Sequence, residues 1–307
     1  MREHLRMVVA FHLPFYAPVW VAQRIGAFQD EDLDITFSIP TPGHAPDALQ
    51  QGDADIAFGG VMRSYVQADR GMPDPHLAIA EINSRDGFFL VSRQPVPDFT
   101  WRHLAGKRLA LFALAPTPWM CLQGVLREHG VDPATVTAVP DLGVAEGMAA
   151  LQSGEVDFLQ TALPMALELA DAGRGYLAAA QAPDVGHVPY SSLIVTPAFR
   201  RERPDLCAKS VRAVTRALRW MAGQTAEAIA GLVVSEFAEF RPEHVRSAVA
   251  TLHAAGAWAE GPHQDRAAYE RLGRFLVAGG LIRTAAPYEA LVDDSFAVAA
   301  AAGGVSA

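Results

Sequence analysis

Short apolar runs alternate with segments of helical periodicity through the first part of the chain. The order is strand 5–11, helix 17–28, strand 33–40, helix 46–51 and strand 54–58. Apolar runs of this length are typical of buried parallel strands, and the helical segments between them supply the crossovers. Pro18 fits the first turn of its helix, where no backbone donor is lost. The pattern predicts one parallel β-α-β-α-β unit, with right-handed crossovers.

The same order of elements restarts near Gly106. The stretch LQQGDADIAFGG (49–60) is answered by LQSGEVDFLQTA (151–162), and in both a helical segment ends in glycine before an apolar strand. The second unit is strand 107–112, helix 117–130, strand 135–140, helix 144–153 and strand 156–159. The matched order predicts two similar α/β lobes in tandem. The alternatives are a chance likeness and a single doubly wound sheet, and the full restart argues against the second.

Four further apolar runs connect the two units and predict a hinge. They cover 77–82, 87–92, 176–180 and 190–195, and the extended segment RQPVPDF (93–99) follows the second of them. We expect the chain to cross between lobes near 93–98 and to return near 193–198. One lobe would then hold 1–95 plus 196–307 and the other 96–195. Helical patterns fill 204–237, 242–257, 264–278 and 288–300, and we expect these helices to pack mostly on the first lobe.

Composition agrees with a globular protein of two cores. The chain has 307 residues, of which 50% are hydrophobic and 19% charged, and this length suits two domains. The net charge of -9 argues against a nucleic-acid partner. No apolar run is long enough to cross a bilayer. Cys121 and Cys207 both lie in helical patterns, so two buried thiols are expected in preference to a disulfide.

Ligands of open α/β sheets bind at the carboxyl ends of parallel strands, so the loops at those ends predict the site. With two lobes facing each other, these loops would line a cleft between them. The candidates from the first lobe are His12, Leu13, Pro14, Phe15, Tyr16, Phe58, Gly59, Gly60, Glu81 and Asn83. The candidates from the second lobe and its return segment are Pro116, Thr117, Trp119, Gln160, Thr161, His187 and Tyr190.

These residue types favour a flat ligand, although each has an ordinary structural alternative. The rings of four candidates could stack on such a ligand or could simply pack the lobe cores; these are Phe15, Tyr16, Trp119 and Tyr190. His12 and His187 could donate to a ligand oxygen or could be ordinary loop histidines. Glu81 could recognise a ring amine or amidine, or could be solvated at a strand end. The Gly59-Gly60 pair would let the backbone approach a ligand closely.

Several motifs resemble those of a known family. They are GAFQDEDLDITF (26–37), LQQGDADIAFGG, LAGKRLAL (104–111), LREHGVDPATVTAVP (126–140), ALQSGEVDF (150–158) and the closing GGLIRTAAPYEALVDDSF (279–296). They resemble type II periplasmic solute-binding proteins of ABC transporters, in the branch that binds sulfonates, nitrate, taurine and the thiamine pyrimidine. The likeness spans nearly the whole chain. One departure is Asp32, which stands where that branch usually has Gly.

The resemblance implies a fold and a function. The fold would be the two-lobed periplasmic-binding-protein type II fold of the α/β class, each lobe a mainly parallel sheet flanked by helices, with a helical C-terminal segment. The function would be to capture a small-molecule ligand by hinge closure and to deliver it to the transmembrane subunit of an ABC permease. No cofactor, metal or nucleic acid is implied, and we expect a monomer. The expected location is the periplasm, with a signal peptide already removed, or alternatively the cytoplasm.

The ligand class departs from that of the anion binders in this branch. Those proteins usually open the second lobe's first helix with a turn rich in Gly and Ser/Thr, whose bare N–H groups suit an anion. Here the turn is ALAPTPWM (113–120), in which two prolines remove donors and Trp119 adds a ring. We therefore favour an aromatic or heterocyclic ligand, either pyrimidine-like or an aromatic acid. An aliphatic sulfonate, taurine or nitrate is the alternative.

An enzyme on the same fold is the second reading, and a cytoplasmic ligand sensor is a third. The fold hosts enzymes, including a thiamine-pyrimidine synthase and an aromatic-acid decarboxylase. A pyridoxal phosphate enzyme would need a lysine in the cleft. Lys107 lies at the entry end of a strand and Lys209 on a late helix. The iron motif of the pyrimidine synthase, nucleophile elbows and metal-ligand clusters are missing. The sequence thus favours a binding protein.

Overall fold

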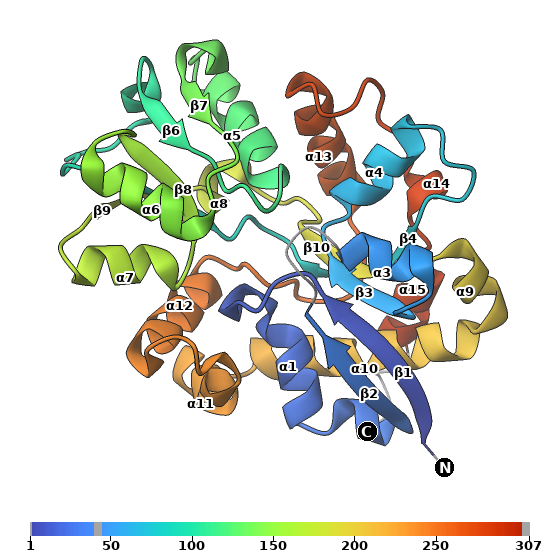
Figure 1. Cartoon of the computed structure of the whole chain (residues 1–307). Helices are drawn as coiled ribbons and strands as arrows, with labels where there is room; N and C mark the ends of the chain where they lie inside the picture. The colour runs from blue at the N-terminus through green and yellow to red at the C-terminus, as the bar shows by residue number, and fades with distance from the viewer. Residues whose placement is uncertain (1, 40–44, 303–307) are drawn as a thin grey trace.

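The structure, a computed structural model, describes residues 2–39 and 45–302 and contains two five-stranded sheets, each in its own lobe (Figure 1). Their strand orders are β2-β1-β3-β10-β4 in the first lobe and β7-β6-β8-β5-β9 in the second. The first sheet consists of β1 (Glu3–Val9), β2 (Leu33–Ser38), β3 (Ile56–Gly59), β4 (Leu77–Asn83) and β10 (Ser191–Val195). The second consists of β5 (Phe88–Ser92), β6 (Arg108–Ala110), β7 (Thr137–Val139), β8 (Phe158–Ala162) and β9 (Tyr176–Ala180).

Helices cover both sheets. Those that precede the second lobe are η1 (Pro14–Tyr16), α1 (Ala17–Arg24), α2 (Ala27–Asp30), α3 (Ala45–Gln51) and α4 (Met62–Asp69). The second lobe and its return segment contain η2 (Trp101–Leu104), α5 (Thr117–Glu128), η3 (Pro133–Thr135), α6 (Val144–Ser153), α7 (Met165–Asp171) and α8 (Ala182–Val185). The C-terminal segment contains α9 (Pro197–Glu202), α10 (Pro204–Ala222), α11 (Ala226–Val233), η4 (Val234–Phe237), α12 (Pro242–Ala254), α13 (Arg266–Ala278), α14 (Tyr288–Leu291) and α15 (Ser295–Ala302).

The predicted duplication is confirmed strand by strand. In the first lobe β1 pairs in parallel with β2 and β3, and in the second β6 pairs in parallel with β7 and β8. An antiparallel strand then joins each trio, β10 beside β3 and β5 beside β8. The two sheets therefore share one topology, as tandem parallel units predict.

The repeated sequence motif performs the same task in both lobes. Asp55 accepts hydrogen bonds from the backbone N and the guanidinium of Arg6, with the backbone bond at 2.8 Å. Asp157 accepts the corresponding backbone bond from Arg108 at 2.9 Å. Each aspartate precedes the third strand of its unit and fixes the register of the first strand. The motif recurs because the same strand pair must be joined twice.

The motif's glycines complete this arrangement. Gly52 and Gly154 adopt the left-handed conformation, with φ of 75° and 83°, which a glycine tolerates without steric cost. Their carbonyls accept from the guanidinium groups of Arg6 and Arg108 at 2.7 and 2.6 Å. The predicted helix ends at these glycines are confirmed.

The chain passes between the lobes at other places than predicted. Because β4 lies in the first sheet and β5 in the second, the first crossing is 84–87. The return runs through 181–190, between β9 and β10. The predicted crossings near 93–98 and 193–198 are therefore wrong, and so is the division into 1–95 plus 196–307 and 96–195, by one strand at each boundary. Segment 93–99 is instead a loop within the second lobe.

The physical reason for this error is that both displaced strands are buried along their whole length. Every residue of β5 and of β10 is buried. A strand with a solvent face shows by its alternation which side meets the core, whereas a fully buried strand reads as a plain apolar run. The sequence pattern therefore does not indicate which of the two sheets such a strand joins.

The C-terminal helices belong to the first lobe but also reach the second. The predicted helix over 204–237 is divided at Gly223 into α10 and α11, and that over 288–300 is divided into α14 and α15. The α10 helix packs against α1, α2, α15 and β4. In contrast, α13 packs against α5 of the second lobe, and α12 contacts α7. Figure 1 shows these two contacts on opposite sides of the gap between the sheets.

Two further expectations can be compared with the structure. Cys121 and Cys207 are both buried and unpaired, as predicted. Within residues 2–39 and 45–302, no helix combines the length and apolar character needed to span a bilayer.

Candidate functional site

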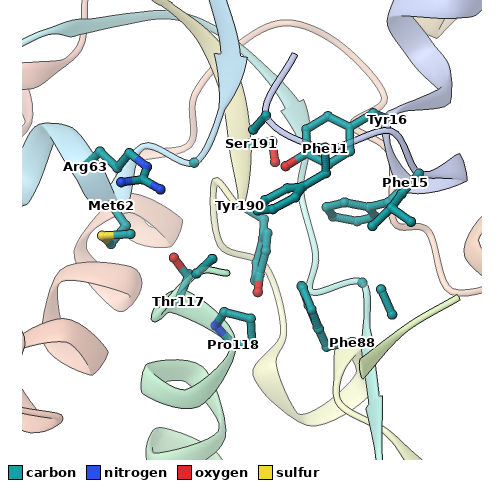
Figure 2. Close-up of a pocket in the computed structure, with 16 residues that line it drawn as sticks. Phe11, Phe15, Tyr16, Met62, Arg63, Phe88, Thr117, Pro118, Tyr190 and Ser191 are labelled. Atoms are coloured by element: carbon teal, nitrogen blue, oxygen red, sulfur yellow. The ribbon is translucent and has the colours of Figure 1, made fainter. Parts of the chain in front are cut away.

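An apolar cavity lies between the two lobes (Figure 2). The space outside the atoms amounts to about 610 Å³ when the open solvent at its mouth is counted, and the part of it in which the centre of a water molecule fits is about 40 Å³. We call it the interlobe cavity. Its lining residues are Ala10, Phe11, Leu13, Phe15, Tyr16, Gly60, Met62, Arg63, Gly87, Phe88, Ala115, Thr117, Pro118, Ala162, Tyr190 and Ser191.

The loop after β1 supplies much of one wall. This loop forms the turn η1, and the carbonyl of Phe15 accepts hydrogen bonds from Asn83 Nδ2 at 2.7 Å and from Trp258 Nε1 at 3.0 Å. The ring of Phe15 lies against Gly87 so closely that a Cβ there would be 2.5 Å from it. Gly87 belongs to the first crossing segment, so the hinge backbone itself packs on the cavity wall. A side chain at this position would push the Phe15 ring out of place.

Five aromatic rings form the wall, and three of them, Phe15, Tyr16 and Tyr190, meet edge to face around Phe15. The ring centroids of Phe15 and Tyr190 are 5.6 Å apart at 87°, and those of Phe15 and Tyr16 are 5.6 Å apart at 86°. Phe11 and Phe88 both pack on the ring of Phe112, outside the cavity lining, at 5.7 and 4.7 Å. Edge-to-face contacts of this kind fix ring orientation beyond what burial alone provides. The wall is therefore a preorganised surface for a flat apolar group.

The polar groups of the cavity are few. Figure 2 shows Arg63 and Thr117 across from the rings of Phe11, Tyr16 and Tyr190. Burial raises the pKa of Tyr16 to about 12 and raises that of Tyr190 well above its ordinary value, so both hydroxyls stay protonated. Burial also lowers the pKa of the Arg63 guanidinium, although an arginine keeps its charge. Among the described residues that line the cavity, none carries a carboxylate, imidazole, primary amine or thiol.

A buried polar chain stands behind the ring of Tyr190 and links the two crossing segments. Asp86 accepts from the backbone N of Phe88 at 2.6 Å and from Gln181 Nε2 at 3.1 Å. The Oε1 atom of Gln181 in turn accepts from Gln160 Nε2 at 2.7 Å. Burial raises the pKa of Asp86 to about 7, although these hydrogen bonds and the nearby Tyr190 hydroxyl lower it. The Tyr190 hydroxyl nevertheless has no hydrogen-bond partner of normal geometry among the described residues.

Six of the residues predicted from the sequence line the interlobe cavity, and they come from both lobes. The residue that the second lobe contributes is Thr117, at the start of α5, and Tyr190 closes the return crossing. The six are Leu13, Phe15, Tyr16, Gly60, Thr117 and Tyr190.

The other predicted polar residues face elsewhere. His12 pairs with Glu239 at 2.6 Å, on the side of η4. His187 pairs with the buried Glu81, also at 2.6 Å; this contact raises the pKa of His187, while burial raises that of Glu81. The remaining candidates support the walls of the cavity. They are Pro14 in η1, Phe58 under Tyr16, Gly59 in a small void beside Gly60, Asn83 on the Phe15 carbonyl, Gln160 in the buried chain and Thr161 paired with Phe89 in the sheet.

Two candidates of the second lobe also miss the cavity. Pro116 lines a groove on the outer side of Met62 and Arg63, which we call the outer groove. Trp119 packs on the hydrophobic core, so its ring is not part of the aromatic wall. Successive residues of an α-helix point about 100° apart. Thr117 and Trp119 are two residues apart and so point to nearly opposite sides, which is why Thr117 faces the cavity and Trp119 does not.

Sequence reasoning missed several lining residues, of which Arg63 and Phe88 matter most. Arg63 is the second residue of α4, one turn beyond the predicted Gly60. Phe88 begins β5, a strand assigned to the wrong lobe. The signal that could have found Arg63 is its position after the strand end Gly59-Gly60, where a helix starts beside the site.

The described lining of the interlobe cavity contains no His, Cys, Asp or Glu side chain. In the described ranges, no three His, Cys, Asp or Glu side chains come together as a metal-binding group.

Similarity to known proteins places this geometry in a family. The NMT1/THI5-like family matches residues 14–228. The chain belongs to that family. With its two five-stranded sheets, it has the periplasmic-binding-protein fold of the type II class, as the resemblance predicted.

Individual relatives cover almost the whole chain. The binding protein YtlA of Bacillus subtilis (strain 168) is 27% identical over 289 residues, which are 93% of this chain and 86% of YtlA. The alkanesulfonate-binding protein SsuA from Xanthomonas axonopodis pv. citri, solved with MOPS, superposes with a TM-score of 0.73 at 15% identity, covering 96% of this chain and 99% of SsuA. A DszB variant solved with biphenyl-2-sulfinic acid superposes with a TM-score of 0.72 at 18% identity, covering 99% of this chain and 100% of DszB.

Proposed function

We propose that this protein is the ligand-binding component of an ABC import system and that it captures a small aromatic or heterocyclic solute between its lobes. The observation that carries the proposal is the interlobe cavity, which residues of both lobes line. Its five rings come from the segment after β1, from the first residue of β5 and from the return crossing. A solute that touches both lobes stabilises the closed state by differential contact. The partners would be that solute and the permease subunit that recognises the closed form, and the site of action would be the periplasm.

The make-up of the cavity supports binding over catalysis. General acid-base chemistry most often uses a carboxylate, imidazole or amine within hydrogen-bond reach of the substrate. A tyrosine can also serve, but burial raises the pKa of Tyr16 and of Tyr190, which disfavours either as a base. The described lining residues offer hydroxyls and one guanidinium instead. Lys107 lines a pocket at the far edge of the second lobe, and Lys209 is paired with Glu3. The names of YtlA and SsuA point the same way, whereas DszB is named a desulfurization enzyme and keeps the enzyme alternative open.

A thermal-shift screen tests the ligand class. Ring compounds such as benzoate, benzamide and a hydroxymethyl pyrimidine are compared with taurine and nitrate. A ligand present at a hundred times its Kd adds about 2.7 kcal/mol to stability, so a true ligand raises Tm by several degrees. We expect stabilisation by ring compounds alone. Stabilisation by taurine or nitrate, and by no ring compound, would contradict the proposal.

Recovery of the bound compound separates the binder from the enzyme. A ring compound that stabilises the protein is incubated with it at a molar ratio near one and is then analysed by mass spectrometry. We expect the compound to return unchanged, because the described lining residues carry no carboxylate, imidazole or amine and burial keeps the two tyrosine hydroxyls protonated. Conversion to a product would favour the enzyme alternative.

A further inference from the structure

Arg63 is a partly buried cation without a partner. It donates no hydrogen bond and forms no ion pair within the described part of the chain. Arg271, by comparison, donates to a carboxylate and two carbonyls. Arg93 and Arg102 also lack such partners in the described part of the chain, but both are exposed to water, whereas Arg63 is partly buried and lines the cavity. The guanidinium of Arg63 instead faces the space across from the aromatic wall (Figure 2). An arginine in this state is suited to an anion that the protein itself does not supply.

Burial makes this cation costly in the absence of an anion. Desolvation is the largest influence on the pKa of Arg63 and lowers it, while the attraction of Asp47 acts in the opposite direction. Asp47 is an exposed residue of α3 and lines the outer groove together with Arg63. A buried charge is stabilised most by close pairing and hydrogen bonding, and no such contact of the Arg63 guanidinium occurs among the described residues. A ligand acid group would meet this need directly.

Thr117 supplies a second donor from the opposite lobe. Its side chain is buried at the first position of α5, and its hydroxyl has no hydrogen-bond partner among the described residues. The α5 helix has 12 residues, so its start carries the positive end of a helix dipole. Pro116, just before the helix, and Pro118, its second residue, both lack N–H donors. In a glycine-rich turn, backbone N–H groups would bind an anion. Here two of those donors are missing, so the Arg63 guanidinium and the Thr117 hydroxyl are the groups that can bind one.

The mouth of the cavity fixes the orientation of the ligand. Arg63 and Met62 line both the interlobe cavity and the outer groove, so they stand where the two spaces meet. Deeper in the cavity the lining is apolar and aromatic. A ligand that enters from the outer groove would place its ring against Phe15 and Phe88 and leave its acid group at the mouth.

We propose that Arg63 anchors the acid group of the ligand, which is an aromatic acid with a flat apolar body and a single carboxylate or sulfonate group. This inference rests on the proposed function and narrows it, because it excludes neutral pyrimidine-like rings as the preferred ligands. The acid group bridges Arg63 of the first lobe and Thr117 of the second, and so favours closure. A guanidinium–acid hydrogen bond of this kind is worth about ten- to a hundred-fold in affinity.

Calorimetric titration of matched acid and amide pairs tests this assignment. Benzoate is compared with benzamide, and benzenesulfonate with benzenesulfonamide, on the wild type and on Arg63→Gln. We expect the wild type to bind each acid about ten- to a hundred-fold more tightly than its amide. Arg63→Gln should abolish that preference and leave amide affinity within a few-fold of the wild type. Arg63→Lys, which keeps the charge, should retain part of the preference.

The matched control is Arg70→Gln. Arg70 ends the same helix and lines the outer groove, but it does not line the interlobe cavity. We expect Arg70→Gln to keep the acid preference of the wild type. Equal loss of acid and amide binding in Arg63→Gln would assign Arg63 a structural role and overturn the inference.

The remaining outcomes distinguish this inference from the proposed function. If the wild type binds the amides as tightly as the acids, the Arg63 assignment fails and the proposed aromatic binding function stands. If neither acids nor amides bind at millimolar concentration, both fail together. An equal loss of preference in Arg70→Gln and Arg63→Gln would indicate general attraction by the groove and would also overturn the assignment.

Discussion

The carboxyl group of Asp86 joins the two segments that connect the lobes. This carboxyl is buried in the first crossing segment, and Gln181 of the return segment donates to it. Tyr190 and Cys121 are the other titratable groups that interact with it, and burial raises the pKa of both of these as well. Because burial disfavours the charged form, the carboxyl retains its proton in the folded protein up to a pH of about 7.

Replacing Asp86 by Asn should remove a pH-dependent loss of stability. Between the ordinary pKa of 3.8 and the raised value of about 7, the folded state holds a proton that the unfolded state releases. The free energy of unfolding therefore falls as pH rises through this window, and the Asp86 contribution levels off above it, after a loss of about 4 kcal/mol. In Asp86→Asn this contribution is absent, so the variant should gain on the wild type from pH 4 to pH 7. Urea unfolding at several pH values measures the difference.

The control is to compare how the free energy of unfolding changes with pH in the two proteins, and not their stabilities at a single pH. Asn keeps an oxygen for the backbone N of Phe88 but places an amide beside Gln181, which adds a constant offset. Glu81 has a raised pKa and Asp55 a lowered one, and these groups shape the pH profile of both proteins equally. Parallel curves for the two proteins would show that Asp86 ionises normally in the fold.

At the residue scale, the sequence predicts which residues lie at the ends of strands, but it does not predict which charged side chains form ion pairs. Phe15 and Tyr190 could be placed at the site because apolar runs locate the carboxyl ends of strands. Asp32 could be recognised as a substitute for glycine, and it does adopt a left-handed φ of 57°. The position of Arg63 after the strand end Gly59-Gly60 could have indicated that it lies near the site. Its lack of a partner could not be predicted, because nothing in a sequence distinguishes an unpaired arginine from one that finds a carboxylate.

Among the elements, the contact between α5 and α13 depends on a glycine at each end. A Cβ added at Gly124 would lie 2.2 Å from the Phe275 ring. At the other end of the contact, a Cβ at Gly279 would lie 2.4 Å from Met120 Sδ. Two helices from different lobes therefore approach more closely than any larger residue would permit. The sequence did not predict this contact, because helical periodicity identifies the buried face of α13 but not the lobe that covers it.

Gly124→Ala should destabilise the protein through this contact. Overpacking of a tight interface typically costs about 1–3 kcal/mol, which exceeds the benefit of about 1 kcal/mol that alanine brings to a helix interior. Urea unfolding should show a net loss, and Phe275→Leu in the same chain should recover part of it. The matched control is Gly231→Ala in α11, where no atom lies within 4 Å of the added Cβ, so alanine should stabilise there. A gain in both single variants would mean that α5 and α13 do not pack together.

For the whole molecule, the order of elements could be predicted, but not the sheet to which β5 and β10 belong. The tandem units and the two lobes follow from the repeated motif. The location of the hinge depends on β5 and β10, which are buried equally well in either sheet. Their positions place 84–87 and 181–190 as the connections between lobes, and the Asp86–Gln181 bond joins these two segments directly.

Two sets of contacts beyond the hinge hold the lobes together on either side of the cavity. Arg271 of α13 donates to the Val185 carbonyl at 2.7 Å and to Glu128 at 2.7 Å. His244 of α12 pairs with Asp171 of α7 at 2.6 Å. Hinged proteins of this kind close by small differences in contact energy between two states. These contacts therefore hold the two lobes in the arrangement that the structure shows.

Removing these contacts should open the unliganded protein. We expect the double variant Arg271→Ala with His244→Ala to have a larger radius of gyration in small-angle X-ray scattering than the wild type, for which a compact chain of this length gives about 19 Å. Arg212→Ala is the control, because Arg212 donates two hydrogen bonds to Glu31 within the first lobe and bridges nothing. A ligand that fills the interlobe cavity should restore compactness to the double variant, since its contacts replace those that were removed. If the double variant scatters like the wild type, the lobes are held by the crossing segments alone.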